Sequence, residues 1–340
     1  MDSNEDAAWN LARELVQIDS SDPGAYEGEI ERHIRAWLRQ RIENLPESLA
    51  SRLSIDELEV LPGRTELMAT IPGATDEPRL VFICHMDTVT LGDGWDDDID
   101  PLSGLIRGDR LYGRGACDMK SGLASAMVAF EAALEKMART GKLPRRGLSL
   151  ICSVDEEDFM RGVEAAIKQG WIGASEWVVD TEPTDAQIQV AHKGRTWFEL
   201  TIQGVTAHAS QPWKGADAIA AMAVAINQIN REIGSQPTHD ELGRSTVTFG
   251  QIEGGYRPYV VPDSCKVWID MRLVPPCDAQ AATKIVQDAI AAAESEVEGC
   301  HGSFVITGDR PAVERDARDH PIAAAPPLPC WPSCSNQPPM

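Results

Sequence analysis

A histidine and several acidic side chains gather where strands end or helices begin. His85 and Asp87 stand in H-M-D-T-V, directly after the apolar run L-V-F-I-C-H. Side chains two residues apart on a strand project to the same side, so one of them can ligate a metal while the other orients its ring. Asp118 stands in the glycine-flanked turn R-G-A-C-D-M-K-S-G, where the backbone can approach a ligand closely. Capping of the following helix is the alternative role for this aspartate.

Two further acidic groups follow apolar runs. Glu156 and Glu157 belong to D-E-E-D at 155–158, after L-S-L-I-C-S-V, and Asp180 and Glu182 belong to V-V-D-T-E-P-T. Carboxylates forced together in a cleft repel one another unless they share a cation or a proton, which indicates a metal site or acid–base chemistry. A solvated acidic loop would explain either group alone. The four segments together predict a shared site.

The elements that must position these side chains can be read from hydrophobic periodicity. Continuous apolar runs at 67–72, 80–85, 148–154 and 177–180 predict buried strands, and helical spacing is found over 7–18, 29–42 and 121–137. This order predicts an α/β catalytic domain with a mixed, mostly parallel sheet and helices on both faces. Ligands of such sheets bind beyond the carboxyl ends of the strands, where the acidic segments fall.

From about His192 the pattern becomes that of a smaller α+β module. Strands are expected over 195–203, 245–252, 264–273 and 303–307, with helices over 216–233 and 278–297. We therefore predict a catalytic domain in residues 1–190, an inserted α+β domain in 191–308, and in 309–340 a return toward the catalytic domain that gives way to a proline-rich tail.

The amino-acid composition disfavours some classes of function. Lys and Arg number 31 against 53 Asp and Glu, a formal net charge of -22, which disfavours nucleic acid and anionic membranes as partners. The N-terminus lacks the features of a signal peptide, and no run approaches the length of a membrane span. The eight cysteines are scattered singly, which is typical of a reducing compartment. These features predict a cytoplasmic protein that acts on small molecules.

The motifs H-M-D-T-V, G-R-G-A-C-D-M-K-S-G, D-E-E and D-T-E-P-T resemble, in order and spacing, those of a zinc metallopeptidase and deacylase family. Its members include acetylornithine deacetylase, succinyl-diaminopimelate desuccinylase, aminoacylase and carboxypeptidase G, and the resemblance covers roughly residues 7–320. It implies two zinc ions per subunit, with cobalt or manganese as substitutes, and an inserted dimerisation (lid) domain that forms a homodimer. The implied reaction is hydrolysis of an amide bond in N-acyl-amino acids or dipeptide-like substrates.

The resemblance also implies roles for individual residues. The implied metal ligands are His85, Glu182, Asp118 as the bridging ligand, and Glu157 for the second ion. Asp180 is the alternative to Glu182. Glu156 would be the general base and Asp87 the support of the histidine ring.

Two residues of the inserted domain also match the family. His208, in G-V-T-A-H-A-S-Q-P, is expected to reach the active site of the partner subunit and stabilise the oxyanion. Arg272, in W-I-D-M-R-L-V-P, is expected to bind the substrate carboxylate, which suits the planar fork of a guanidinium group.

The C-terminal part departs from the family pattern. A late histidine that binds the second metal is expected there, and neither His301 nor His320 has the matching context. The expected consequences are weak binding of the second metal, low activity and poor solubility. A catalytically impaired relative that binds metal and dimerises is therefore the alternative to an active enzyme. A phosphate-binding function has only the glycine-rich stretch around Gly113 and Gly115 in its favour, without G-K-[ST] or a basic cradle.

Overall fold

The structure of the chain, a computed structural model, describes residues 3–185, 187, 189 and 191–314. The chain divides into two compact units, Met1–Asp185 and the residues from Ala186 onward, and each unit is described by itself. The expected proline-rich tail and His320 lie outside the described residues.

The first unit is built on a five-stranded mixed sheet, in the order β2-β3-β8-β4-β9. The strands are β2 (Ser54–Leu61), β3 (Arg64–Ile71), β4 (Leu80–His85), β8 (Leu148–Ser153) and β9 (Trp177–Asp180). Strand β4 pairs in parallel with β8 and β9, whereas β3 pairs antiparallel with β2 and β8. The predicted mixed sheet is confirmed, and the four pairings described within it are two parallel and two antiparallel.

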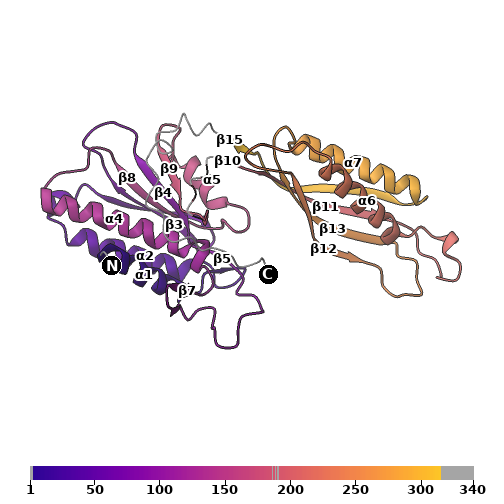
Figure 1. The fold of residues 1–340 in the computed structure, drawn as a ribbon, viewed down its shortest axis with the longest axis horizontal. Helices are drawn as coiled ribbons and strands as arrows, with labels where there is room; N and C mark the ends of the chain where they lie inside the picture. Colours follow the sequence, from indigo (N-terminus) through magenta and orange to yellow (C-terminus); the bar gives the residue numbers. More distant parts are fainter. Residues whose placement is uncertain (1–2, 186, 188, 190, 315–340) are drawn as a thin grey trace. The chain divides into compact units, whose positions relative to one another are not determined.

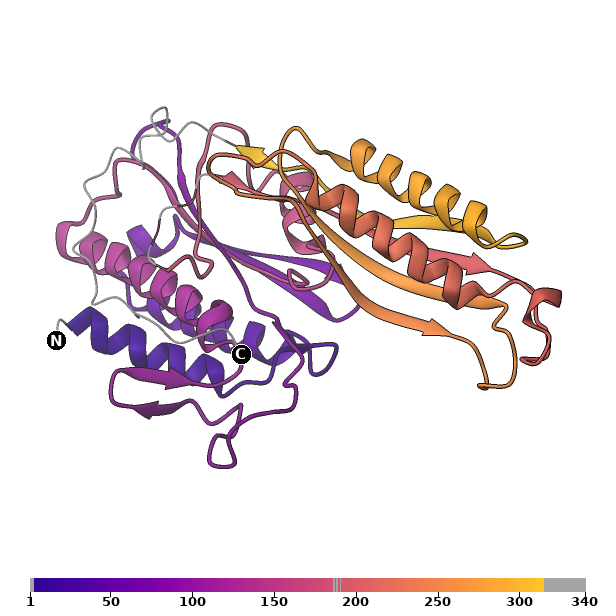
Figure 2. The same ribbon diagram turned by 45° about the vertical axis from the view of Figure 1, so that its right-hand side comes forward.

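Helices cover both faces of this sheet, as predicted (Figures 1 and 2). One face packs against α1 (Ser3–Val16), α2 (Gly28–Glu43) and α4 (Ser121–Thr140), in a core that includes Leu15, Ile34, Leu67, Leu123 and Leu150. The other face packs against the shorter α5 (Arg161–Lys168) through Met68, Ile83, Ile151, Ala166 and Trp171. Adjacent strand residues such as Leu67 and Met68 thus enter different cores, which follows from the alternation of side chains along a strand.

Short elements complete the first unit. Helix α3 spans Glu47–Ala50, β1 (Ser21–Asp22) pairs in parallel with β5 (Thr88–Val89), and β6 (Leu105–Arg107) forms a hairpin with β7 (Arg110–Tyr112). The turn η1 (Ala116–Lys120) leads into α4. Strand β1 thereby fixes the N-terminal segment beside the chain that follows His85.

The second unit is an antiparallel sheet with two helices on one face, as the sequence predicts (Figure 2). Its strand order is β12-β13-β11-β14, with β11 (Gly194–Gln203), β12 (Thr246–Gly254), β13 (Ser264–Leu273) and β14 (His301–Arg310). Helices α6 (Ala218–Gly234) and α7 (Ala279–Glu296) bury that face around Phe198, Met222, Val267, Met271 and Val286. Strands β10 (Ala191–His192) and β15 (Val313–Glu314) pair with each other, and a 3-10 turn, η2, spans Pro212–Lys214.

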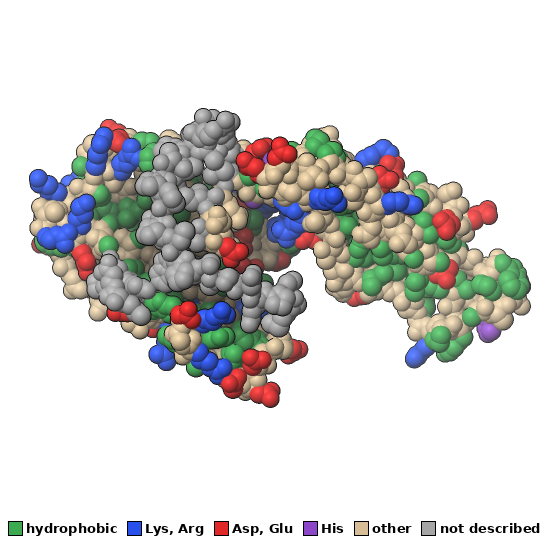
Figure 3. Space-filling view, viewed as in Figure 1, with side chains coloured by type: hydrophobic (Ala, Val, Ile, Leu, Met, Phe, Trp, Pro, Cys, Tyr) green, Lys and Arg blue, Asp and Glu red, His purple; other side chains and the backbone are tan. Residues whose placement is uncertain are grey.

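Acidic and basic side chains are interspersed over the visible surface of both units (Figure 3). None of the helices in the described part of the chain has the length and apolarity needed to cross a membrane.

Candidate metal centre

Three parallel strands bring the acidic segments to one edge of the first sheet. His85 ends β4, the D-E-E segment follows β8, and Glu182 follows β9. In the register of these strands, His85 lies opposite Ser153 and Ile83 lies opposite Asp180. The carboxyl ends of parallel strands therefore deliver side chains that are about 100 residues apart in sequence to the same place.

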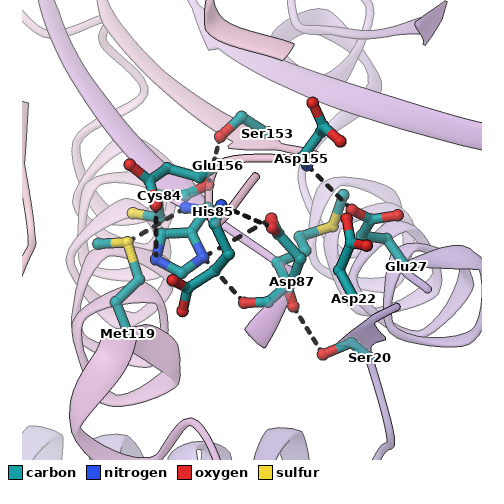
Figure 4. A network of polar contacts seen from close by, with 12 residues as sticks. Ser20, Asp22, Glu27, Cys84, His85, Asp87, Met119, Ser153, Asp155 and Glu156 are labelled. Carbon is teal, nitrogen blue, oxygen red and sulfur yellow. Dashed lines mark hydrogen bonds and ion pairs between the residues drawn. The ribbon is translucent and has the colours of Figure 1, made fainter. Parts of the chain in front are cut away.

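The imidazole of His85 is the centre of this cluster (Figure 4). The residue is 2% exposed. Its Nε2 atom lies 3.1 Å from Oδ1 of Asp118, 3.5 Å from Oε1 of Glu182 and 4.0 Å from Oε2 of Glu156. The ligand atoms of His85, Asp118 and Glu182 all lie within 4.8 Å of one another. Three of the four predicted metal ligands therefore form one compact group.

The other ring nitrogen of His85, Nδ1, contacts Asp87, the residue predicted to support the ring. The contact is made by the backbone carbonyl of Asp87 and not by its carboxylate. Nδ1 donates a hydrogen bond to the backbone carbonyl of Asp87 at 2.8 Å, while the Asp87 carboxylate lies 3.7 Å away. Because the carbonyl can only accept, Nδ1 carries the proton and Nε2 faces the acids. The buried carboxylate of Asp87 instead accepts from the backbone N–H of Glu157 at 3.0 Å, so Asp87 holds both the ring and the D-E-E turn.

The charges of the cluster shift the pKa values of its members. Burial alone would lower the pKa of His85, but the hydrogen bond with Asp118 and the nearby carboxylates raise it to about 10. The same hydrogen bond lowers the pKa of Asp118. Burial raises the pKa of Glu182 to about 8, and repulsion from Asp180 and Asp118 adds to this. The potential at Nε2 is thus strongly negative and favours a bound positive charge.

Glu157 faces the same cluster from the D-E-E turn. Burial raises its pKa to about 6, and repulsion from Asp118 contributes to the rise. Glu157 is not part of the compact three-ligand group, and its expected role at a second ion stays a prediction. Asp180, the alternative to Glu182, is also raised in pKa to about 6 by burial, but it is not in that group either.

Two glycines allow the Asp118 turn to approach the strand ends. Gly115 adopts a left-handed conformation with φ of 80°, where a Cβ atom would lie 2.6 Å from the Thr88 side chain. At Gly122, in the first turn of α4, a Cβ atom would lie 2.3 Å from the carbonyl oxygen of Thr181. The absence of side chains at these positions lets Asp118 lie next to the residue that follows Thr181, which is Glu182.

Behind the cluster lies a buried ion-pair network that the sequence analysis did not predict. Arg64, at the start of β3, donates to Glu27, to Asp22 at 2.7 Å and to Asp155 at 3.1 Å. Asp155 also accepts two side-chain bonds from Arg161, each 2.6 Å, and its backbone N–H donates to Glu27 at 3.0 Å. The D-E-E turn is therefore anchored from both sides; Figure 4 shows Asp155 of this turn beside Glu27.

Asp155 itself is fully buried in a left-handed conformation with φ of 63°. Burial would raise its pKa, but the bonds from Arg161 and the charge of Arg64 lower it, so it stays ionised. Asp22, Glu27 and Asp87 also bring carboxylate oxygens within 4.8 Å of one another. Because Arg64 donates to both Asp22 and Glu27, we read this second group as part of the ion-pair network.

A mostly apolar cavity of about 290 Å³ opens beside the cluster. Glu156 and Glu182 line one part of it, and side chains from the face of the sheet that carries α5 line the rest, including Ile83, Val163, Ile172 and Val178. It offers apolar surface next to the acidic side chains.

The structure places His208 and Arg272 in the second unit. His208 is exposed in the segment after β11, where its Nδ1 atom lies 2.9 Å from the hydroxyl of Ser210. Arg272 is exposed on β13 and donates to Asp270 through Nε at 3.0 Å and Nη2 at 2.9 Å. Their expected contacts with substrate remain predictions.

The group fits a divalent metal ion on its own chemistry. It offers one neutral imidazole nitrogen and several carboxylate oxygens, a ligand set that suits zinc and is also compatible with cobalt or manganese. The raised pKa values of His85, Glu157 and Glu182 report an excess of negative potential that a dication would relieve. The arrangement of residues supports a metal centre.

Comparison with known proteins identifies peptidases among the relatives of this chain. Residues 66–241, a little over half of the chain, match the model of peptidase family M28, and residues 190–298 match a peptidase dimerisation domain. The uncharacterized protein YgeY of Escherichia coli (strain K12) is 29% identical over 280 residues, which are 78% of this chain and 66% of YgeY. A probable carboxypeptidase of Aspergillus terreus is 31% identical over 221 residues, or 62% of this chain and 48% of the relative. The chain thus spans about half to two thirds of the length of these relatives.

Solved structures show the same fold. Aminopeptidase PepT from Bacillus cereus superposes with a TM-score of 0.67 at 24% identity, covering 94% of this chain and 79% of PepT. Human carnosine dipeptidase 1 gives a TM-score of 0.66 at 14% identity, covering 94% and 80%. On the match to the peptidase family model, supported by this shared fold, the chain belongs to the zinc metallopeptidase and deacylase family that its motifs resemble.

Proposed function

We propose that this protein hydrolyses an amide bond in N-acyl-amino acids or dipeptide-like substrates by metal-dependent catalysis. The observation that carries the proposal is the convergence of Asp118, Glu182 and Glu156 on Nε2 of His85, at the carboxyl ends of three parallel strands. A buried ring surrounded by carboxylates from separate segments is a typical arrangement for a metal centre, and an exposed acidic loop would not need it.

In this proposal His85, Asp118 and Glu182 would hold one ion, and Glu157 together with Asp118 would contribute to holding a second. Bound metals of this kind lower the pKa of a water molecule and polarise the scissile carbonyl group. Asp87 keeps the proton on Nδ1 of His85, so Nε2 presents its lone pair to the ion. Zinc is the expected ion.

Glu156 is proposed as the general base. Its Oε2 atom lies 4.0 Å from Nε2 of His85, at the edge of the three-ligand group and outside it. A carboxylate in this place can take a proton from water and then give it to the leaving amine. The anchoring of Asp155 by Arg64 and Arg161 fixes the backbone from which Glu156 projects.

The substrate contacts are assigned by residue type. The apolar cavity beside Glu156 suits the acyl part of the substrate. Arg272 is proposed to bind the substrate carboxylate, and His208 is proposed to stabilise the oxyanion. The match of residues 190–298 to a peptidase dimerisation domain supports a homodimer. A cytoplasmic location remains a prediction.

The test combines metal counting with turnover. The purified chain is loaded with zinc, bound metal is measured by elemental analysis, and release of free amino acid is followed on N-acetyl-amino acids, N-succinyl-amino acids and dipeptides. Glu156→Ala should abolish turnover while metal content stays unchanged. Glu164→Gln, a change of an acidic residue on α5 away from the cluster, should leave both unchanged.

The outcomes separate the two function classes. Two zinc ions per chain with turnover that depends on Glu156 would establish a two-metal amidohydrolase. Zinc binding that needs His85 without turnover on any substrate would favour a metal-binding relative that has no catalysis. Turnover that persists in Glu156→Ala would contradict the assignment of the base.

A further inference from the structure

The cavity beside the candidate metal centre lies between α5 and one face of the first sheet. Ile83 of β4 and Val178 of β9 line it from the sheet, and Val163 and Ile167 line it from α5. Glu182, a member of the three-ligand group, also lines it. A group held at the candidate metal ligands can therefore extend directly into this cavity.

The acidic and apolar parts of the lining occupy different ends of the cavity. Asp180 ends β9 and Glu182 follows it, whereas Val178 lies two residues earlier on the same face of that strand. Helix α5 connects β8 with β9, which are both parallel to β4, so it runs back from the carboxyl ends of these strands. Ile167, in its last turn, therefore lies farther from the acids than Val163 in its first turn. The lining thus becomes apolar with distance from the metal centre.

No lysine or arginine is among the described residues that line this cavity. Its acidic members are Glu156, Asp180 and Glu182, and the rest of the lining is mostly aliphatic. A carboxylate that entered the cavity would lose water without gaining a cationic partner from the lining, and it would face these acids. The lining therefore disfavours a charged acyl group such as succinyl and favours a neutral one.

The apolar part of the lining is accessible to a bound group. Ile167 is 55% exposed and Val178 is 41% exposed. An apolar chain in the cavity would cover these side chains, and each methylene group buried in this way contributes about fourfold to affinity. The cavity volume of about 290 Å³ is roughly twice that of the ~150 Å³ cavity that holds one benzene molecule. The space therefore suits a group of roughly six to ten carbon atoms.

We propose that this cavity is the acyl subsite, and that the protein prefers N-acyl-amino acids whose acyl group is an apolar chain or ring of about six to ten carbon atoms. The inference rests on the proposed function, in which Arg272 binds the carboxylate of the amino acid that is released. That assignment leaves the acyl half of the substrate for the cavity. Val178 and Ile167 then determine specificity, because they line the part of the cavity that only a long acyl group reaches.

Turnover of three N-acyl derivatives of one amino acid tests the preference for size and charge. The zinc-loaded chain is assayed by release of alanine from N-acetyl-alanine, N-hexanoyl-alanine and N-succinyl-alanine. The kcat/KM of the hexanoyl substrate should exceed that of the acetyl substrate about tenfold or more, because four further methylene groups are buried. The kcat/KM of the succinyl substrate should lie at least about tenfold below that of the acetyl substrate.

Val178→Lys tests the charge of the cavity at a position where the variant should fold, because Val178 is 41% exposed and β9 lies at the edge of the described sheet. The new cation gives the succinyl carboxylate a partner. The ratio of kcat/KM for hexanoyl-alanine to that for succinyl-alanine should therefore fall at least about tenfold. Ile106→Lys is the matched control, since Ile106 is 40% exposed on β6 and does not line the cavity. It should leave this ratio unchanged.

Binding can be measured without metal and without turnover. Acetamide, hexanamide and succinamate are titrated into the chelated full chain, and the methyl resonances of its isoleucine and valine residues are followed by NMR. Hexanamide should bind about tenfold or more tightly than acetamide and should shift the resonances of Ile83, Val163 and Val178. Succinamate should bind no more tightly than acetamide. Val178→Lys should weaken the binding of hexanamide and strengthen that of succinamate.

These results distinguish the acyl subsite from the proposed function. Turnover that is equal for the acetyl and hexanoyl substrates, or fastest for the succinyl substrate, would overturn the acyl subsite and leave the hydrolase intact. Absence of turnover on every substrate would refute the proposed function, and the hexanamide titration would then decide the subsite. Hexanamide that binds no more tightly than acetamide, or a substrate ratio that Val178→Lys does not change, would reject it.

Discussion

Glu66 is a buried carboxyl group that has no counter-charge beside it among the described residues. It lies on β3 and is 0% exposed, and neither of its side-chain oxygens has a hydrogen-bond partner among the described residues. One oxygen lies 3.0 Å from the position that a Cβ atom of Gly162 would take, at the start of α5 and close to the D-E-E turn. Burial raises the pKa of this carboxyl to about 8. We therefore predict that Glu66 is protonated in the folded protein at neutral pH.

The sign of the effect on stability follows from proton linkage. Between pH 4.5 and 8 the folded state keeps the proton that the unfolded state has released, so the free energy of unfolding falls as pH rises through this window. Below pH 4.5 this carboxyl is protonated in both states, so it does not make the free energy of unfolding depend on pH. Above pH 8 it is ionised in both states, and the free energy of unfolding falls no further. A pKa raised from 4.5 to about 8 corresponds to a loss of roughly 4 kcal/mol between pH 5 and pH 8.5.

The substitution that tests this reasoning is Glu66→Gln, which keeps the shape of the protonated acid at every pH. Urea denaturation is compared for wild type and variant at pH 5 and pH 8.5, because comparison in the same buffer cancels the pH response of other groups. The variant should be close to wild type at pH 5 and clearly more stable at pH 8.5. Glu43→Gln, at an exposed position of α2, serves as the control. Equal pH slopes for wild type and Glu66→Gln would refute the protonated state of Glu66.

Three further substitutions test the framework of the site. Arg64→Met leaves buried carboxylates without their cation, so the free energy of unfolding should fall by about 3 to 5 kcal/mol, measured by urea denaturation. Gly122→Ala places a methyl group 2.3 Å from the Thr181 carbonyl and should separate the Asp118 turn from Glu182, which titration calorimetry would detect as weaker zinc binding. Asp217→Ala removes the side chain that accepts from two backbone N–H groups at the start of α6, and it should cost about 1 kcal/mol in chemical denaturation of the second unit.

The elements that carry the candidate metal ligands were the easiest to predict. The apolar runs at 80–85 and 177–180 coincide with β4 and β9, and the run at 148–154 coincides with β8 to within one residue. Strands β4 and β8 are largely buried, so their sequences are mostly apolar and predict strands clearly. The four residues of β9 are half-buried or exposed, but three of them are apolar as well. Because acids follow each of these strands directly, the edge at which the cluster forms could also be predicted.

The elements that the sequence did not predict lack a clear hydrophobic pattern. Strand β2, S-I-D-E-L-E-V-L, lies at the edge of the sheet, and its residues are exposed or half-buried. Its sequence therefore contains several acidic residues and lacks the apolar run that would predict a strand. Helix α5 has only eight residues, too few for periodicity to be convincing. Near the site, the contact of Nδ1 of His85 with the backbone carbonyl of Asp87 depends on local geometry that residue types do not determine.

The Arg64 network could not be read from the sequence for a different reason. It joins position 64 to positions 22, 27 and 155, and no local pattern links these residues. The network nevertheless explains how the acidic loop D-E-E-D at 155–158 is held at the end of β8. Arg64 and Arg161 form ion pairs with Asp155 and fix the turn. The next two acids, Glu156 and Glu157, therefore remain close to His85 despite their mutual repulsion. The negative charge around His85 is available to bind a cation, since Arg64 and Arg161 pair with Asp22, Glu27 and Asp155 and not with the candidate ligands.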